Sequence, residues 1–143
     1  MPSALKWLFD TDHVSLHERG YPSLKNRLEA APPGSIAASV VTVEDVLRGR
    51  LAVLARRSAG DARVRAYDKF LESVRFFSSV PVVRFDLACE EKFQELRAQG
   101  IRVGSQDLRI ASTALVNDLV LVTRNTRDFT KIPRLSLEDW SLE

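Results

Sequence analysis

The sequence contains a single cysteine, Cys89, and no long apolar segment. One cysteine excludes an intrachain disulfide, a zinc site built from several thiolates and a CxxC redox pair. The longest uncharged run, residues 30–43, is interrupted by two prolines and a glycine, whereas a membrane span needs about 20 apolar residues. The first residues also lack the charged and apolar regions of a secretory signal. We therefore expect a soluble, cytoplasmic protein.

Net charge is low as well. The 21 Lys and Arg residues nearly balance the 19 Asp and Glu residues, so the overall charge of +2 does not indicate nucleic-acid binding. Sixteen of the basic residues are Arg, whose planar guanidinium suits bidentate phosphate contacts, although a compositional bias of the source would produce the same excess. A chain of 143 residues, 45% of them apolar, is typical of one globular domain, and we expect residues 1–143 to fold as one.

Short apolar segments alternate with helical patterns along the chain. The segments typical of buried strands are residues 5–9, 36–41, 80–85 and 119–122. Apolar residues at helical spacing predict helices over residues 42–57, 61–77, 87–98 and 105–117, with a capping box formed by Thr42 and Asp45 and a cap at Ser105. This alternation predicts an α/β fold of three layers, α/β/α, around a mostly parallel sheet of four to five strands.

Acidic residues lie where these strands end or where the helices begin. Asp10 and Asp128 follow apolar strands, and Asp45 and Asp107 fall in the first turns of their predicted helices. Parallel α/β sheets bind ligands at this edge, and four carboxylates there would raise one another's pKa unless a cation neutralised them. Mg²⁺ or Mn²⁺ is the expected cofactor because hard cations prefer oxygen ligands. Each acid also has a structural alternative, such as complementing a helix dipole or capping a turn.

Four short motifs carry these acids in a recognisable order. They are LFDTD at residues 8–12, SVVTVEDVLRG at 39–49, GSQDLRIA at 104–111 and LVTRNTRDF at 121–129. In order and spacing they resemble the PIN-domain ribonucleases of the VapC toxin type, and residues 132–140 are similar to the closing strand and tail of that family. The resemblance spans almost the whole chain and is weakest over residues 61–79.

This resemblance implies a PIN-like domain with Mg²⁺- or Mn²⁺-dependent endoribonuclease activity. A metal-activated water would cleave RNA phosphodiesters and leave 5′-phosphate and 3′-hydroxyl ends. The protein would be the toxin of a type II toxin–antitoxin pair, with a cognate antitoxin, an RNA substrate and a second copy of itself as partners.

The resemblance also assigns residues to the site. The catalytic and metal-binding acids are Asp10 and Asp107 as principal ligands, and Asp45 and Asp128, which complete the ring directly or through water. The residues that match hydrogen-bonding positions around these acids are Thr11, Thr123 and Asn125.

Two positions depart from the family pattern. The family usually has Asn in place of Asp12 and Glu in place of Asp45. Asp45 is one methylene shorter than Glu, so either its metal contact passes through water or the neighbouring Glu44 turns inward. Helical periodicity does not decide which of the two acids faces the site. We expect Asp45 to do so and keep Glu44 as the alternative. Asp12 is either a further metal contact or a helix N-cap, and we expect the cap.

Three alternatives start from the same residues. Residues 10–14, DTDHV, also fit the nucleophile motif of haloacid-dehalogenase-like phosphatases, with Asp10 attacking the phosphoryl group, but the required Lys and later acidic pair are not evident. A catalytically impaired PIN-fold module that binds RNA or protein would retain the fold. His13 and His17 have a spacing that could ligate zinc, although no partner acid pattern follows them.

Overall fold

The computed structural model of this chain describes residues 4–18, 20–56 and 59–142. Within these ranges, five strands form one sheet in the order β3-β2-β1-β4-β5, and every neighbouring pair is parallel. The strands are β1 (Trp7–Phe9), β2 (Ile36–Ser39), β3 (Val82–Val83), β4 (Val120–Val122) and β5 (Leu137–Glu138). The predicted parallel α/β sheet is therefore confirmed, with strands shorter than the apolar runs that predicted them.

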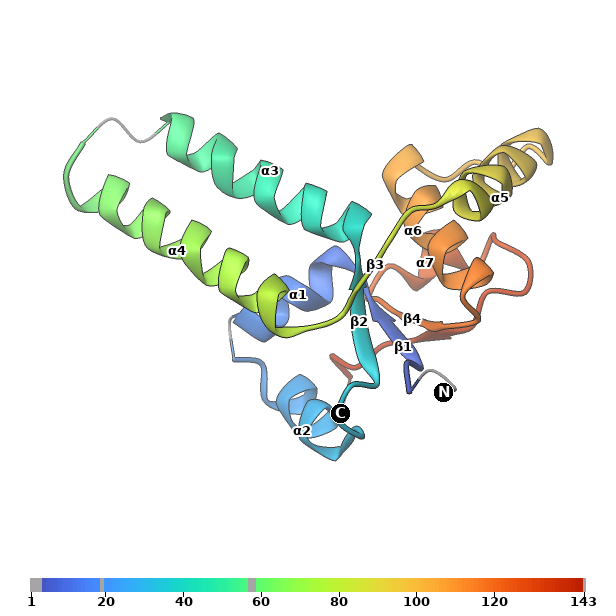
Figure 1. Ribbon diagram of the computed structural model, residues 1–143, viewed down its shortest axis with the longest axis horizontal. Coiled ribbons are helices and arrows are strands. Elements are labelled where there is room, and N and C mark those ends of the chain that lie inside the picture. The colour runs from blue at the N-terminus through green and yellow to red at the C-terminus, as the bar shows by residue number, and fades with distance from the viewer. Residues whose placement is uncertain (1–3, 19, 57–58, 143) are drawn as a thin grey trace.

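Helices lie on both faces of this sheet. They are α1 (Thr11–Glu18), α2 (Pro22–Ala30), α3 (Val40–Arg56), α4 (Gly60–Ser79), α5 (Leu87–Ala98), α6 (Ser105–Val116) and α7 (Thr126–Phe129). Figure 1 shows α5, α6 and α7 on one side of the strands, and α1 with the long pair α3 and α4 on the other. The fold thus has the three predicted layers. The sequence patterns did not indicate α2 or the single turn α7, and they indicated α1 only through the expected N-cap at Asp12.

Alternation along the strands sends neighbouring side chains to opposite layers. Leu8 pairs in register with Ala37 and Leu121, and these residues belong to the core cluster under α5 and α6. The next register row, Phe9 with Ala38 and Val122, belongs to the second cluster, which α1, α2, α3 and α4 cover. The sheet is therefore buried on both faces, as expected for parallel strands.

The start of α3 differs from the prediction. Its first residue is Val40, and the backbone N–H of Thr42 donates to Ser39 Oγ at 3.0 Å. Ser39, the last residue of β2, therefore caps the helix, and Asp45 lies in the second turn. The predicted capping box of Thr42 and Asp45 is wrong because the strand leads into the helix without an intervening loop.

The predicted cap of α6 is also wrong. Ser105 is the first residue of that helix, and Gly104 occupies the N-cap without a side-chain hydrogen bond. The Ser105 hydroxyl instead accepts a hydrogen bond of 2.8 Å from Arg97 Nη2. Arg97 also donates to the carbonyls of Ile101 and Val103, so it ties the loop before α6 to the end of α5.

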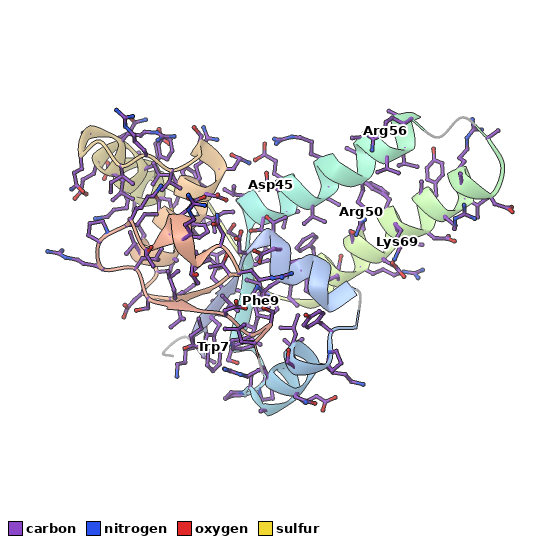
Figure 2. The ribbon with its side chains drawn as sticks, turned by 180° about the vertical axis from the view of Figure 1, so that it is seen from behind. Trp7, Phe9, Asp45, Arg50, Arg56 and Lys69 are labelled. Atoms are coloured by element: carbon purple, nitrogen blue, oxygen red, sulfur yellow. The ribbon has the colours of Figure 1, made fainter. Side chains whose placement is uncertain are left out.

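Figure 1 shows α3 and α4 extending together beyond the sheet as a helical arm. Arg50 of α3 donates to the fully buried Ser73 hydroxyl of α4 at 3.1 Å, which links the two helices. In Figure 2, Asp45 lies at the end of α3 nearest the sheet and Arg56 at the opposite end. In the ranges described above, no helix combines the length and apolar character needed to cross a membrane.

Candidate active site

The sheet order defines where a site can form. From β1 at the centre, the chain moves outward through β2 and β3, and later places β4 and β5 on the other side. In such sheets ligands bind beyond the carboxyl ends of the strands where the winding direction changes, here between β1 and β4. Asp10 directly follows β1, and Thr123 directly follows β4. The two residues therefore meet at this edge although 113 positions separate them.

Asp10 is buried at this edge, with 5% of its surface exposed. Its Oδ1 accepts a hydrogen bond of 2.7 Å from the backbone N–H of Thr11, and its Oδ2 accepts one of 2.8 Å from the Thr123 hydroxyl. Burial, and then the charge of Asp12, raise the pKa of Asp10 from 3.8 to about 7, against the two hydrogen bonds, which lower it. The carboxyl is thus well oriented but costly to ionise.

Asp107 and Asp128 are linked through one amide. Asn125, between β4 and α7, has its Nδ2 at 3.2 Å from Asp128 Oδ2 and at 3.5 Å from Asp107 Oδ2. Burial, followed by the charges of Asp128, Asp45 and Asp12, raises the pKa of Asp107. Asp107 in the first turn of α6 therefore lies within the electrostatic reach of acids from three other helices.

Asp45 and Glu44 have different surroundings on α3. The Thr11 hydroxyl lies 3.5 Å from Asp45 Oδ2, and 20% of the Asp45 side chain is exposed. Glu44 is 52% exposed and forms an ion pair with Arg48 one turn further along the helix. The charge of Asp45, but not that of Glu44, is among those that raise the pKa of Asp107. Of the two neighbouring acids, Asp45 is the one that faces the site.

Asp12 lies inside the first turn of α1, so its predicted role as an N-cap is wrong. Helix α1 begins one residue earlier, at Thr11. The Asp12 carboxylate instead reaches the segment directly after β4, where its Oδ2 accepts from the Arg124 backbone N–H at 3.2 Å and lies 3.5 Å from the Thr123 hydroxyl. The negative charge of Asp12 is also among the causes that raise the pKa of Asp10 and Asp107. Asp12 therefore supports the site from the side of β4.

His13 is fully buried behind Asp12 and holds the C-terminal segment. Its Nε2 accepts from the backbone N–H of Trp140 at 3.1 Å, which places the ring proton on Nδ1, 2.9 Å from Asp12 Oδ1. These contacts explain His13 as a structural residue. The side chain of His17, the other half of the possible zinc pair, lies outside the described residues.

No protein-family model matches the chain. The chain is 30% identical over 141 residues to the tRNA(fMet)-specific endonuclease VapC of Shigella flexneri, and the alignment covers 96% of this chain and 99% of that protein. This chain belongs to the VapC family of PIN-domain ribonucleases. The resemblance seen in the sequence motifs is thereby confirmed.

One further curated relative and one solved structure agree with this assignment. Ribonuclease VapC2 of Rickettsia felis is 38% identical over 69 residues, which span 46% of this chain and only 52% of that relative's length. A solved toxin–antitoxin complex from Klebsiella pneumoniae contains a chain that is 27% identical, with a TM-score of 0.71. That match covers 94% of this chain and 98% of the solved one. The similarity therefore extends over the whole fold.

VapC membership disfavours the phosphatase alternative, and the structure agrees. The required lysine would have to lie near Asp10, but Lys69 and Lys92 lie on α4 and α5, and Lys131 forms its ion pair with Asp128. Lys69 and Lys92 each form an ion pair with an acid of the same helix, Glu72 or Glu95.

The sequence interpretation of this VapC site missed Gln106. Its amide lies 2.8 Å from both Asp45 Oδ1 and Glu44 Oε1. The motif at residues 104–111 includes Gln106 next to Asp107, but spacing within a helix cannot show that the side chain reaches α3. Among the described residues, no three His, Cys, Asp or Glu side chains already converge as a metal cage.

Proposed function

We propose that this protein is a Mg²⁺- or Mn²⁺-dependent endoribonuclease and the toxin of a toxin–antitoxin pair. One observation carries the proposal: acids from separate helices and strand ends gather at this edge of the sheet, where burial, and then the charges of neighbouring acids, raise the pKa of Asp10 and Asp107. Membership of the VapC family supports the same activity. The acids in the proposed catalytic and metal-binding set are Asp10, Asp45, Asp107 and Asp128.

The donor set suits a hard divalent cation. All four groups offer carboxylate oxygens, and the repulsion among them is relieved when a cation lies between them. When bound, Mg²⁺ or Mn²⁺ supplies water activation and stabilises the charge that develops on the scissile phosphate. We place Asp10 and Asp107 as the principal ligands because burial, and then the neighbouring acids, raise the pKa of both carboxyls, and a bound cation would offset this cost of ionisation.

Neutral hydrogen-bond donors orient Asp10 and Asp107 without cancelling their charge, whereas Asp45 and Asp128 also lie 3.6 Å from the cationic groups of Arg48 and Lys131. Thr123 and the Thr11 backbone hold the two oxygens of Asp10, and Asn125 spans Asp107 and Asp128. Each donor fixes a carboxylate in one orientation, so less freedom is lost when a cation and RNA bind. This is the role that we propose for Thr11, Thr123 and Asn125.

We propose an RNA substrate, an antitoxin and a second copy of this chain as partners. The Klebsiella pneumoniae structure is a toxin–antitoxin complex, which supports an antitoxin. A stripe of exposed apolar side chains on α4 offers surface for a protein partner; it consists of Val64, Tyr67, Leu71 and Val74 at spacings of three and four. Light scattering on the purified protein tests the homodimer, which a mass of one chain would exclude.

The activity is tested by cleavage of an RNA panel with Mg²⁺, Mn²⁺ or EDTA. The panel contains single-stranded and structured RNAs, including tRNA(fMet), which the Shigella flexneri relative is named for. We expect cleavage with either metal, none with EDTA, and products with 5′-phosphate and 3′-hydroxyl ends. Cleavage that persists in EDTA, or cyclic phosphate ends, would contradict the mechanism. RNA binding without cleavage at any metal concentration would favour the impaired binding module.

A further inference from the structure

Gln106 joins the two helices that carry Asp45 and Asp107. From the first turn of α6, its Nε2 donates to Asp45 Oδ1 and to Glu44 Oε1, both at 2.8 Å, and its Oε1 accepts from Arg109 Nη1. Both amide hydrogens thus face carboxylates, and the carbonyl faces a guanidinium. Because a flipped amide would turn its carbonyl toward two negative charges, only this orientation satisfies all three partners.

The protein core holds this amide in place. The Arg109 guanidinium lies over the ring of Phe93, at 5.1 Å from its centroid, and Phe93 is buried in the core cluster under α5. Arg97 contacts the same ring at 5.5 Å while it anchors the loop that leads into α6. A continuous set of contacts therefore runs from Phe93 through Arg109 and Gln106 to Asp45.

Arg48 competes with Gln106 for Asp45. Its Nη1 lies 3.6 Å from Asp45 Oδ1, and its side chain is 61% exposed on the next turn of α3. This ion pair draws the carboxylate along the helix surface and partly offsets its charge. Gln106, in contrast, holds the same oxygen from the turn that carries Asp107 and leaves the charge intact. Asp45 Oδ2 lies 3.5 Å from the Thr11 hydroxyl.

We infer that Gln106 is a positioning residue that holds Asp45 toward the other acids. The inference rests on the proposed function, because the purpose of the orientation is to present Asp45 to a divalent cation. It also explains how a side chain as short as Asp45 can take part in the site from the second turn of α3. Gln106 touches neither the cation nor RNA in this role and acts through Asp45.

The test is a double-mutant cycle read out by Mn²⁺ affinity. Mn²⁺ is titrated into metal-free wild-type protein, Gln106→Leu, Asp45→Asn and the double variant, and free Mn²⁺ is measured by electron paramagnetic resonance. Removing an outer partner of a metal ligand typically weakens affinity about 10- to 100-fold, so we expect Gln106→Leu to raise the Mn²⁺ Kd about tenfold. In the Asp45→Asn background the same change is expected to have no further effect.

Two further variants make the result specific. Gln106→Met keeps the side-chain length and should behave as Gln106→Leu does. Gln94→Leu removes a similar amide bond of 2.8 Å to Glu90 on the exposed face of α5, and it should leave Mn²⁺ affinity unchanged. Two outcomes would overturn the inference but leave the proposed function standing. One is an unchanged Mn²⁺ affinity in both Gln106 variants, and the other is an equal loss of affinity in the wild-type and Asp45→Asn backgrounds. Wild-type protein that neither binds Mn²⁺ nor cuts RNA would overturn the inference and the proposed function together.

Discussion

Asp10→Asn and Asp107→Asn are each expected to reduce metal-dependent RNA cleavage about 100-fold or more, since loss of even an outer partner of a metal ligand costs about 10- to 100-fold. Asn keeps the size of the side chain and one hydrogen-bonding oxygen but removes the negative charge that a divalent cation requires. Both acids sit at the centre of the acidic set, and both are oriented by neutral donors. Single-turnover cleavage of the RNA cut most rapidly by the wild type measures the loss.

Asp68→Asn is the matched control for this result. Asp68 lies exposed on α4, away from the strand ends, so the same change in net charge should leave cleavage unaltered. Asp45→Asn and Asp128→Asn should be less severe than the two central variants, because these acids complete the proposed site from its rim. If Asp10→Asn retained the wild-type rate, the assignment of Asp10 as a principal ligand would be wrong.

The same Asp10→Asn substitution is expected to stabilise the metal-free protein near neutral pH. Burial and neighbouring acids raise the pKa of Asp10 in the folded state to about 7, whereas the unfolded chain keeps a value near 3.8. Between these values the folded state binds the extra proton, so its stability falls as pH rises from about 4 to about 7. A pKa difference of this size lowers the free energy of unfolding by about 4 kcal/mol at most, at about 1.4 kcal/mol per pKa unit.

Asn at position 10 removes this penalty and still fits the site. Its carbonyl can accept from the Thr11 backbone, and its amide can donate to the Thr123 hydroxyl oxygen. Thermal unfolding in EDTA at pH 5 and pH 8 measures the effect. We expect Asp10→Asn to unfold about 5–10 °C above the wild type at pH 8, by the usual relation of midpoint to free energy, and with a much smaller difference at pH 5.

Addition of Mg²⁺ should reverse this order of stability. A cation that binds only the folded state stabilises it by mass action, and Asp10→Asn is expected to bind the cation weakly. The wild-type midpoint should therefore rise with Mg²⁺ while that of Asp10→Asn stays nearly constant. A lower midpoint of Asp10→Asn in EDTA at pH 8 would show that the ionised Asp10 is not costly. If Asp10→Asn is the more stable protein in EDTA and the wild type is the more stable one in Mg²⁺, Asp10 serves activity at the expense of stability.

Local patterns were sufficient for most of the fold. Short apolar runs that alternate with helical periodicity predicted a parallel sheet with helices on both faces, and the limits of α5 at residues 87–98 were correct. These features depend on residues near one another in the sequence, because burial on both faces requires uninterrupted apolar strands. Only the start of helix α1 was expected, from the cap proposed at Asp12. The helix is short and its sequence is polar, so its position depends on the buried contact between His13 and Trp140.

The sequence by itself determined which acids gather at one edge of the sheet, since the carboxyl ends of parallel strands meet there. It also determined the family, through four motifs in order. Only the tertiary structure decided that Asp45 faces the site while Glu44 pairs with Arg48, that Asp12 reaches the segment directly after β4, and that Gln106 spans two helices. These choices depend on contacts between residues as much as 112 positions apart, and periodicity along one helix carries no information about what lies opposite it.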